Sequence, residues 1–236
     1  MKVILQLLLL SVLMLFNGCV GQKDRVTQND RSRDVEMQTT AGTMVLRLSD
    51  ATPMHRDNFL KLVKSKYYDS ILFHRVIKNF MIQAGDDQSR RAQSGQPLGN
   101  SSVPYLIDAE FQPQLFHKKG ALAAARTGDD VNPEKKSSGS QFYIVQGRVF
   151  TDAGLDSVET NRLKGRKIPV AHREVYKNIG GSPHLDQNYT VFGELVKGFD
   201  VLDSIAATTT SKAIDRDRPL NDVRIIKARL IRRKNY

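Results

Sequence analysis

Apolar and polar residues alternate between Met44 and Leu48 with the two-residue period of a β-strand. Met44, Leu46 and Leu48 fall on one face of an extended chain, and Arg47 falls on the other. Gly42 supplies a turn just before them. The segment therefore predicts a strand at the start of the folded part of the chain.

The next segment changes to helical spacing. Thr52 can cap a helix, and Pro53 suits the first helical position. The apolar residues that follow recur at intervals of three and four and form one stripe, which consists of Phe59, Leu62, Val63 and Tyr67. The sequence predicts one amphipathic helix here.

The remaining chain is dominated by short apolar runs rich in β-branched and aromatic residues, separated by Gly, Asn and Pro. These runs predict strands within 71–85, 120–126, 140–147, 189–196 and 222–231. A second helix is predicted after Gly198, in the stretch FDVLDSIAA. Because strands dominate and helices do not alternate with them, the pattern favours a mainly β fold with a closed or sandwiched antiparallel sheet.

The N-terminus carries a separate signal in residues 1–18. Lys2 precedes the apolar run VILQLLLLSVLMLF, which is short, lies at the very start and indicates a secretory signal. The stretch LFNGC then ends at Cys19, the only cysteine of the chain, and resembles the lipobox of bacterial lipoproteins. The resemblance implies cleavage before Cys19, lipidation of that residue and attachment to a membrane. An ordinary signal peptide that leaves a free thiol is the alternative.

Residues 19–37 are charged and polar, with almost no apolar periodicity. Such a segment cannot bury enough apolar surface to offset the entropy lost on ordering. We therefore expect a flexible tether over 19–37 and one folded domain over 38–236.

Composition narrows the choice of partners. Lys and Arg number 36 against 25 Asp and Glu, which gives a net charge of +11. The positive residues are spread along the chain apart from the C-terminal RLIRRKNY, so a solvated basic surface is favoured over nucleic-acid binding. The five histidines lack metal-ligand spacing and there is one cysteine, so no metal and no cofactor is predicted.

Several separated motifs resemble, in the same order, those of the cyclophilin family of peptidyl-prolyl cis-trans isomerases. They include FHRVIKNFMIQAGD at 73–86, GSQFYIVQG at 139–147 and LDQNYTVFGELVKGFDVLDSI at 185–205. The resemblance covers most of 38–205. It implies a closed eight-stranded antiparallel barrel capped by two helices, with a groove on its outer wall that binds proline-containing polypeptides.

The chemistry of this reaction explains the polar residues in apolar strands. Rotation of an X-Pro bond breaks amide resonance against a barrier of about 20 kcal/mol and needs no nucleophile. A donor aimed at the proline nitrogen stabilises the twisted state more than the planar states. The resemblance assigns catalysis to Arg75 and Gln83. It assigns substrate binding to Phe80, Met81, Gln141, Tyr143, Leu185, Tyr189, Ala125, Arg126 and His184.

Each of these residues has a simpler interpretation when it is taken alone. Arg75 could be a surface or structural ion-pair residue, and Phe80 could be an ordinary strand residue. Gln83 and Gln141 could satisfy backbone groups at a barrel edge. The presence of all of them in the order of one family favours the site.

Three positions depart from the pattern common in the family. Arg126 stands where an Asn is frequent, and Tyr189 stands where many eukaryotic members have a His. His184 replaces a Trp that provides a stacking surface and an indole donor in many members, so we expect weak cyclosporin binding.

Two segments are insertions relative to the family. The charged loop at 128–138 precedes Gln141, and we expect it to overhang the groove. The larger insertion at 147–183 predicts a helix capped by Thr151 or Asp152 that ends near Gly165, with Leu155, Val158 and Leu163 facing inward. We expect this insertion to pack against the barrel, because so long a segment in a compact domain has structure of its own. Selection of a partner protein is the alternative.

Together the patterns predict a lipid-anchored cyclophilin-type isomerase that assists folding of exported or envelope proteins in the bacterial cell envelope. One alternative is a module or chaperone that binds proline-containing segments, with incidental catalysis. Another is a basic protein that contacts acidic polymers through its C-terminal RLIRRKNY.

Overall fold

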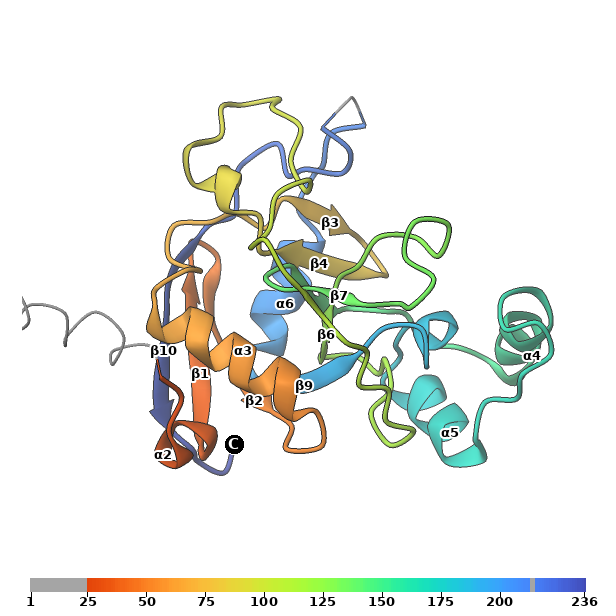
Figure 1. Cartoon of the computed structure of the whole chain (residues 1–236). Helices are drawn as coiled ribbons and strands as arrows, with labels where there is room; N and C mark the ends of the chain where they lie inside the picture. Colours follow the sequence, from red (N-terminus) through yellow and green to blue (C-terminus); the bar gives the residue numbers. More distant parts are fainter. Residues whose placement is uncertain (1–24, 213–214) are drawn as a thin grey trace, which may run out of the picture.

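An eight-stranded antiparallel sheet forms the centre of the computed structural model, which describes residues 25–212 and 215–236. The sheet has the order β10-β1-β2-β9-β6-β8-β4-β3 and curls around the main hydrophobic core (Figure 1). Its strands are β1 (Arg33–Thr39), β2 (Gly42–Leu48), β3 (Arg75–Ile77), β4 (Met81–Ala84), β6 (Ala121–Ala124), β8 (Phe142–Val145), β9 (Val191–Lys197) and β10 (Ile225–Arg232). A separate pair joins β5 (Leu106–Ile107) and β7 (Ser137–Ser138). The predicted mainly β fold is confirmed.

The two ends of the curled sheet are joined by individual backbone hydrogen bonds and not by a continuous ladder. The segment before β3 bonds to the region of β10, with 2.8 Å from Ser70 N to Ile225 O and 2.9 Å from Phe73 N to Val223 O. These bonds link the two edges of the curled sheet. They satisfy backbone N–H and C=O groups that would be unpaired at an open edge.

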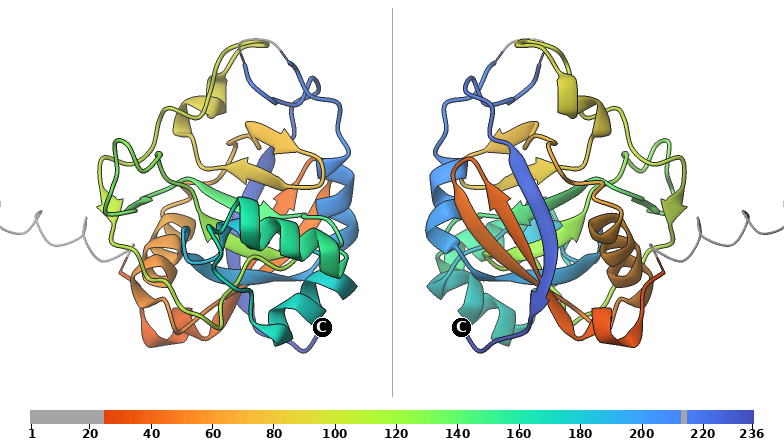
Figure 2. Two further views of the ribbon diagram at one scale, coloured as in Figure 1. Left: turned by 90° about the vertical axis from the view of Figure 1, so that its right-hand side faces the viewer. Right: turned by 90° about the vertical axis from the view of Figure 1, so that its left-hand side faces the viewer.

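Strands β1 and β2 direct alternate residues into the core, whereas β6 and β8 are buried on both faces. In the pair β1–β2, Val35 lies opposite Leu46 and Met37 lies opposite Met44, and all four side chains are buried in the core. The right-hand view of Figure 2 shows β10 running across β1 and β2 on this side of the barrel.

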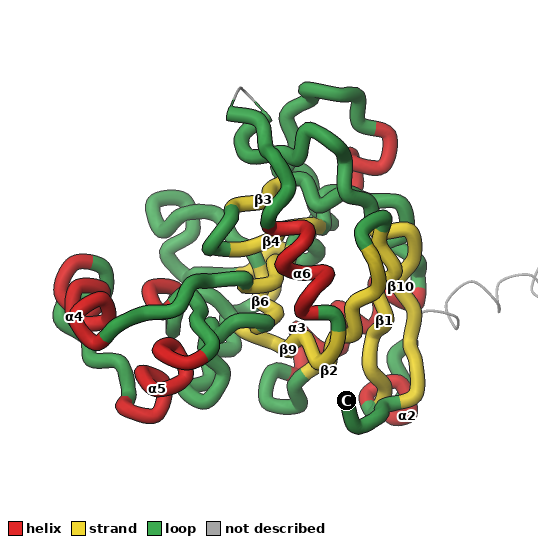
Figure 3. Tube along the Cα trace, turned by 180° about the vertical axis from the view of Figure 1, so that it is seen from behind, coloured by secondary structure: helices red, strands yellow, loops and turns green. Residues whose placement is uncertain are grey.

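The two predicted helices both pack against this core. They are α3 (Pro53–Lys64) and α6 (Phe199–Ala206), and α6 lies in the foreground of Figure 3. Phe59 from α3 and Leu202 from α6 belong to the same buried cluster. Tyr67, which was expected in the stripe of the first helix, lies beyond its end.

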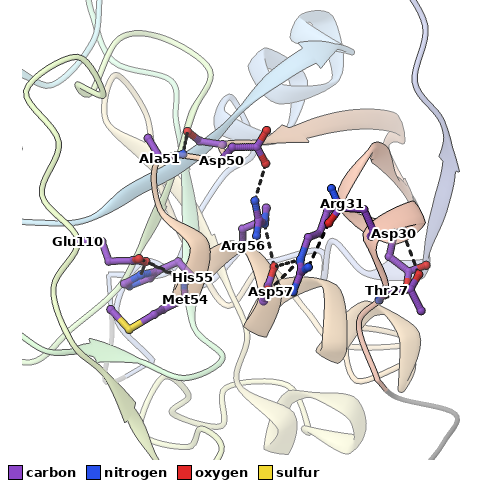
Figure 4. A network of polar contacts seen from close by, with 12 residues as sticks. Thr27, Asp30, Arg31, Asp50, Ala51, Met54, His55, Arg56, Asp57 and Glu110 are labelled. Atoms are coloured by element: carbon purple, nitrogen blue, oxygen red, sulfur yellow. Dashed lines mark hydrogen bonds and ion pairs between the residues drawn. The ribbon is translucent and has the colours of Figure 1, made fainter.

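The N-terminus of α3 is capped differently from the prediction. Thr52 occupies the N-cap position and Pro53 is at the first turn, but the Thr52 side chain makes no capping hydrogen bond. Instead, the Glu110 carboxylate accepts hydrogen bonds from Met54 N at 3.1 Å and His55 N at 2.9 Å (Figure 4). A carboxylate at this position also interacts favourably with the helix dipole.

The prediction of a flexible tether up to residue 37 is wrong for its described part. A short helix, α2 (Gln28–Arg31), is followed by β1, whose residues pair with both β2 and β10. Thr27 and Asp30 form a capping box at the start of α2. The folded region therefore begins before residue 38.

Ion pairs hold α2 against α3. Arg31 Nη2 lies 2.7 Å from Asp57 Oδ2 (Figure 4). Lys64 Nζ lies 2.7 Å from Asp30 Oδ2. The sequence analysis missed this segment because it is fixed by polar contacts between distant residues, which leave no apolar periodicity.

The predicted signal sequence and Cys19 lie outside the described residues. Within the part of the chain that the structure describes, no helix is long and apolar enough to cross a membrane.

The large insertion forms a small unit of two helices, α4 (Asp152–Asn161) and α5 (Val170–Asn178). The side chain of Thr151 caps α4 as predicted, whereas α5 was not predicted. The unit lies on the side of the barrel away from α2 and faces the viewer in the left view of Figure 2. It has its own buried cluster, comprising Phe150, Leu155, Leu163, Ile168 and Tyr176, against which Phe116 and Val158 pack.

Candidate functional site

The hairpin of β3 and β4 places two predicted polar residues side by side. Arg75 pairs with Gln83 across the two strands, so their side chains share one face, and Arg75 Nη1 donates to Gln83 Oε1 at 3.3 Å. The alternate residues Val76 and Ile82 point into the core. The mixed character of the sequence here therefore reflects a barrel wall with an apolar inner face and an outer face that carries both polar and apolar side chains.

Neighbouring strands complete the wall. On β8, Tyr143 lies opposite Gln83, and on β6, Ala123 lies opposite Tyr143. The outer face of this wall carries a cavity of about 140 Å³. It is lined by Arg75, Phe80, Met81, Gln83, Ala125, Arg126, Tyr143, Leu185 and Tyr189. All of these are site residues expected from the sequence.

The two other expected binding residues contact this lining. Gln141 Oε1 accepts a hydrogen bond from Gln83 Nε2 at 3.0 Å. The ring of His184 stacks on Phe80, with 5.6 Å between ring centroids. Burial lowers the pKa of His184 to about 4, so the ring is neutral at neutral pH and presents an aromatic surface at the edge of the cavity.

A chain of side-chain amides holds Arg75 in place. Gln83 accepts from Arg75 and donates to Gln141, whose Nε2 donates in turn to the backbone oxygens of Gly99 and Ser101, each at 2.9 Å. Among the described residues, no carboxylate forms a salt bridge with Arg75, which does not support the ion-pair interpretation. The guanidinium is therefore oriented while its positive charge stays unneutralised.

One rim of the cavity is built by Arg126 and Tyr189. The Arg126 guanidinium lies over the Tyr189 ring at 4.5 Å, and its Nε donates to Asn188 O at 2.8 Å. The charged loop at 128–138 reaches the same rim, because Asp129 pairs with Arg126 at 2.7 Å and Lys135 Nζ donates to Asn188 Oδ1 at 2.6 Å. The loop thus contacts the edge of the cavity.

The sequence analysis missed a buried histidine behind the cavity. His117 Nε2 lies 2.9 Å from the Tyr143 hydroxyl, and His117 Nδ1 lies 2.9 Å from Asp186 Oδ1. A tyrosine in an otherwise apolar strand such as β8 requires a partner for its hydroxyl, and this is the signal that could have led to His117. Burial raises the pKa of Tyr143 well above its usual value, so its hydroxyl stays protonated.

Size alone does not identify the site. A larger cavity of about 240 Å³ lies beside β2, β9 and residues 114–118, but none of the expected site residues lines it. In the described part of the chain, His, Cys, Asp and Glu side chains nowhere gather in a group of three or more that could hold a metal ion. The chemistry available in the smaller cavity is the oriented guanidinium of Arg75 beside apolar side chains, with the ion-paired Arg126 at the rim.

Comparison with known protein families and curated proteins gives a consistent result. A sequence model described as "Cyclophilin type peptidyl-prolyl cis-trans isomerase/CLD" matches residues 34–230. A protein of Staphylococcus haemolyticus named as a peptidyl-prolyl cis-trans isomerase is 36% identical over 82% of this chain and 89% of its own length. A Streptococcus pyogenes protein named as a bifunctional phosphatase and peptidyl-prolyl cis-trans isomerase is 39% identical over 83% of this chain. The chain spans only 38% of the length of that relative.

Solved structures share the fold. A cyclophilin-type isomerase of Cryptosporidium parvum superimposes with a TM-score of 0.59 at 23% identity, over 86% of this chain and 99% of that one. A second structure of the same protein, obtained in the presence of the dipeptide Ala-Pro, has a TM-score of 0.58 over 84% and 98% of the two chains. At this identity the likeness concerns the fold.

Proposed function

The chain belongs to the cyclophilin-type peptidyl-prolyl cis-trans isomerase family, and on that premise we propose that the cavity beside Arg75 is its active site. The observation that carries the proposal is the orientation of an unneutralised guanidinium in a cavity that also exposes the apolar side chains of Phe80, Met81 and Leu185. Isomerisation of an X-Pro bond needs such a donor and no nucleophile, metal or cofactor.

Arg75 would act as the donor to the proline nitrogen. As the bond twists, that nitrogen regains a localised lone pair, so the hydrogen bond from the guanidinium is stronger in the twisted state than in either planar state. Gln83 and Gln141 hold the guanidinium through the hydrogen bonds described above. Because they restrict it before substrate arrives, little reorganisation is needed during the rotation.

The apolar lining would hold the proline ring. Phe80, Met81, Tyr143 and Leu185 bring aromatic and aliphatic surface to the cavity, and Tyr189 adds a second aromatic wall. The presence of Ala-Pro with the Cryptosporidium relative supports a proline-containing peptide as the substrate class. Ala125 and Arg126 lie at the opposite edge, where the backbone of an extended substrate would pass.

We further propose that the substrates are exported or envelope proteins. The support is the signal-like N-terminus and the LFNGC stretch, which would place a lipid on Cys19 in a bacterial envelope. The first described residue, Arg25, shortly precedes α2, and α2 lies on the side of the barrel away from α4 and α5 (Figure 1). A lipid at Cys19 would therefore tether the domain from the end remote from the insertion.

The enzymatic part is tested by cis/trans exchange of a short Ala-Pro peptide, measured by NMR with the chain from residue 22 onward. We expect exchange to accelerate at catalytic concentrations of protein. Absence of acceleration by folded protein would contradict the proposed activity and would leave the cavity as a peptide-binding site.

The anchoring part is tested separately by labelling the full-length chain with a radioactive fatty acid in a bacterial host. Incorporation is expected in the wild-type chain and not in a Cys19→Ser variant. Equal labelling of both, or of neither, would contradict lipidation at Cys19 without affecting the assignment of the active site.

A further inference from the structure

A buried chain of hydrogen bonds connects the insertion to the floor of the active-site cavity. Tyr176 on α5 donates from its hydroxyl to Asp186 Oδ2 at 2.7 Å. The other carboxylate oxygen, Oδ1, lies 2.9 Å from His117 Nδ1, and His117 Nε2 lies 2.9 Å from the hydroxyl of Tyr143. All four residues are buried, and Tyr143 lines the cavity. The chain thus runs without interruption from α5 to β8.

The donors fix the direction of the bonds at Asp186. Its carboxylate accepts from Tyr176 and also from the backbone N–H of His117, at 2.8 Å. A carboxylate can only accept, so His117 Nδ1 carries a proton; in the neutral tautomer with that proton, Nε2 accepts from Tyr143. Burial raises the pKa of both tyrosines, which keeps both hydroxyls protonated as donors.

The same aspartate sits within the segment that forms one wall of the cavity. Leu185 immediately precedes Asp186, and Tyr189 follows it by three residues; both line the cavity. The backbone oxygen of Asp186 accepts a hydrogen bond from Arg166 Nη2 of the insertion at 2.6 Å. Two contacts from the insertion therefore converge on one residue of the cavity wall.

The position of Tyr176 is closely determined by packing. Its ring meets Phe116 edge to face at 5.5 Å between centroids. Gly181 passes so close that a Cβ on it would lie 2.5 Å from a ring carbon of Tyr176 and 2.3 Å from the backbone oxygen of His117. A side chain at Gly181 would push α5 away from the barrel, so glycine permits the approach that the hydrogen bonds need.

We infer that Tyr176 is a positioning residue for the isomerase, which acts through Asp186 and His117 to fix the ring of Tyr143 and the wall formed by Leu185 and Tyr189. This inference rests on the proposed active site. It gives the insertion a part in shaping the proline-binding cavity in addition to its own packing. The Tyr143 hydroxyl is held by His117, so the apolar surface of its ring is what the cavity presents to substrate.

The test is a double-mutant cycle with Tyr176→Phe, Tyr143→Phe and the double variant. Removal of the Tyr176 hydroxyl is expected to raise KM roughly three- to tenfold, the equivalent of one net hydrogen bond, with kcat nearly unchanged. A residue that shapes the cavity affects ground state and twisted state alike, so the effect appears in KM. Both substitutions break the same chain of hydrogen bonds. The KM of the double variant should therefore be no higher than that of the more impaired single variant.

Tyr105→Phe is the matched control. The Tyr105 hydroxyl donates to Asn58 Oδ1 at 2.7 Å and has no part in the chain. Its loss should leave KM unchanged. If Tyr176 only stabilises the insertion, Tyr176→Phe will lower Tm while KM stays at the wild-type value, or the two single effects will add; either result overturns the inference.

A second readout does not depend on catalysis. In spectra of protein with 13C-labelled tyrosine, the ring signals of Tyr143 should shift in Tyr176→Phe and stay in place in Tyr105→Phe. Unchanged Tyr143 signals would overturn the coupling. An inactive wild-type protein would instead contradict the proposed function, and the Tyr143 signals would then decide the coupling alone.

Discussion

Two charged side chains, Arg75 in the cavity wall of the barrel and Glu159 in the inserted α4–α5 unit, have very different partners. In the insertion, the buried carboxylate of Glu159 has a partner for each oxygen: Lys167 Nζ at 2.7 Å on one, and Arg173 Nη1 at 2.9 Å with Ile168 N at 3.0 Å on the other. In the cavity wall, the half-buried Arg75 has only a neutral amide partner. Next to it in the chain but outside the cavity lining, buried His74 has no hydrogen-bond partner on either ring nitrogen among the described residues.

This contrast distinguishes a site from a scaffold. Unpaired polar groups cost stability when they are buried, so a fold retains them where they serve substrate or where no partner can be reached. Arg75 faces a cavity that can receive a substrate, whereas Glu159 ties a loop to two helices. Changes in the wall should therefore affect catalysis first, and changes in the insertion should affect stability first.

The largest effect is expected from Arg75→Ala. Loss of the donor should lower kcat/KM roughly 100- to 1,000-fold, the range found when a preorganised transition-state donor is removed. Tm should change little because no ion pair is broken. The measurement is NMR exchange of an Ala-Pro peptide together with thermal unfolding.

Arg173→Ala is the matched control in the insertion. It removes salt bridges to Asp152, Asp156 and Glu159, so Tm should fall while kcat/KM of the folded protein stays near wild type. The comparison fails if the Arg173 variant loses activity as strongly as the Arg75 variant.

The next effect tests whether the insertion folds on a core of its own. Leu155 on α4 is fully buried in that cluster, so Leu155→Ala should lower the free energy of unfolding by roughly 2–5 kcal/mol. Denaturant titration measures this loss. A kcat/KM that stays within twofold of wild type below the transition would support the contrast, and a tenfold fall would show that packing of α4 also shapes the cavity.

Most residues of the cavity wall could be predicted from the sequence because they lie close together along the chain. Arg75, Phe80, Met81 and Gln83 lie within one hairpin, where alternation separates core from groove. The strands, α3, α6 and the Thr151 cap of α4 also follow from short-range patterns.

The features that the sequence analysis missed depend on contacts between distant residues. The first is α2, which is held by Arg31–Asp57 and Lys64–Asp30 ion pairs. The hydrogen bonds from Tyr143 to Tyr176 likewise join β8, a loop and α5. Because these segments are far apart in the sequence, no residue spacing predicts the contact. The helix α5 begins after Pro169 without a side-chain cap, and only one of its residues, Tyr176, is buried. A short helix with so narrow an apolar stripe gives little periodic signal.

A smaller effect should appear in the core beside β3 on acidification, at His74. Burial lowers the pKa of His74 to about 4, from a usual 6.5. Between pH 6.5 and 4 the unfolded state therefore binds a proton at His74 more readily than the folded state. The contribution of neutral His74 to the free energy of unfolding is complete above pH 6.5 and is lost as the pH falls towards 4. The full shift corresponds to roughly 3 kcal/mol.

Unfolding free energies of wild type and His74→Asn, measured between pH 7 and 4, test this point. The wild-type curve should fall more steeply than that of the variant, whatever the offset between them at pH 7. Parallel curves would mean that His74 is not the group that titrates, and the acid sensitivity of the barrel would then belong to another buried side chain.

The smallest effect belongs to Glu159, the paired carboxylate of the insertion. The hydrogen bond from Lys167, joined by Ile168 N and Arg173, lowers the pKa of Glu159 to about 2, from a usual 4.5. Because the folded-state pKa is the lower one, the contribution of the Glu159 carboxylate to the free energy of unfolding is present above pH 4.5 and is lost as the pH falls through 2.

Glu159→Gln should lower Tm at pH 6, and the difference from wild type should shrink steadily between pH 4.5 and 2. Since His74 loses its contribution above pH 4 and Glu159 below 4.5, acid should weaken the packing around His74 in the barrel before it weakens the insertion. A Tm difference that persists unchanged at pH 2 would show that the ion pairs around Glu159 contribute through packing and not through charge.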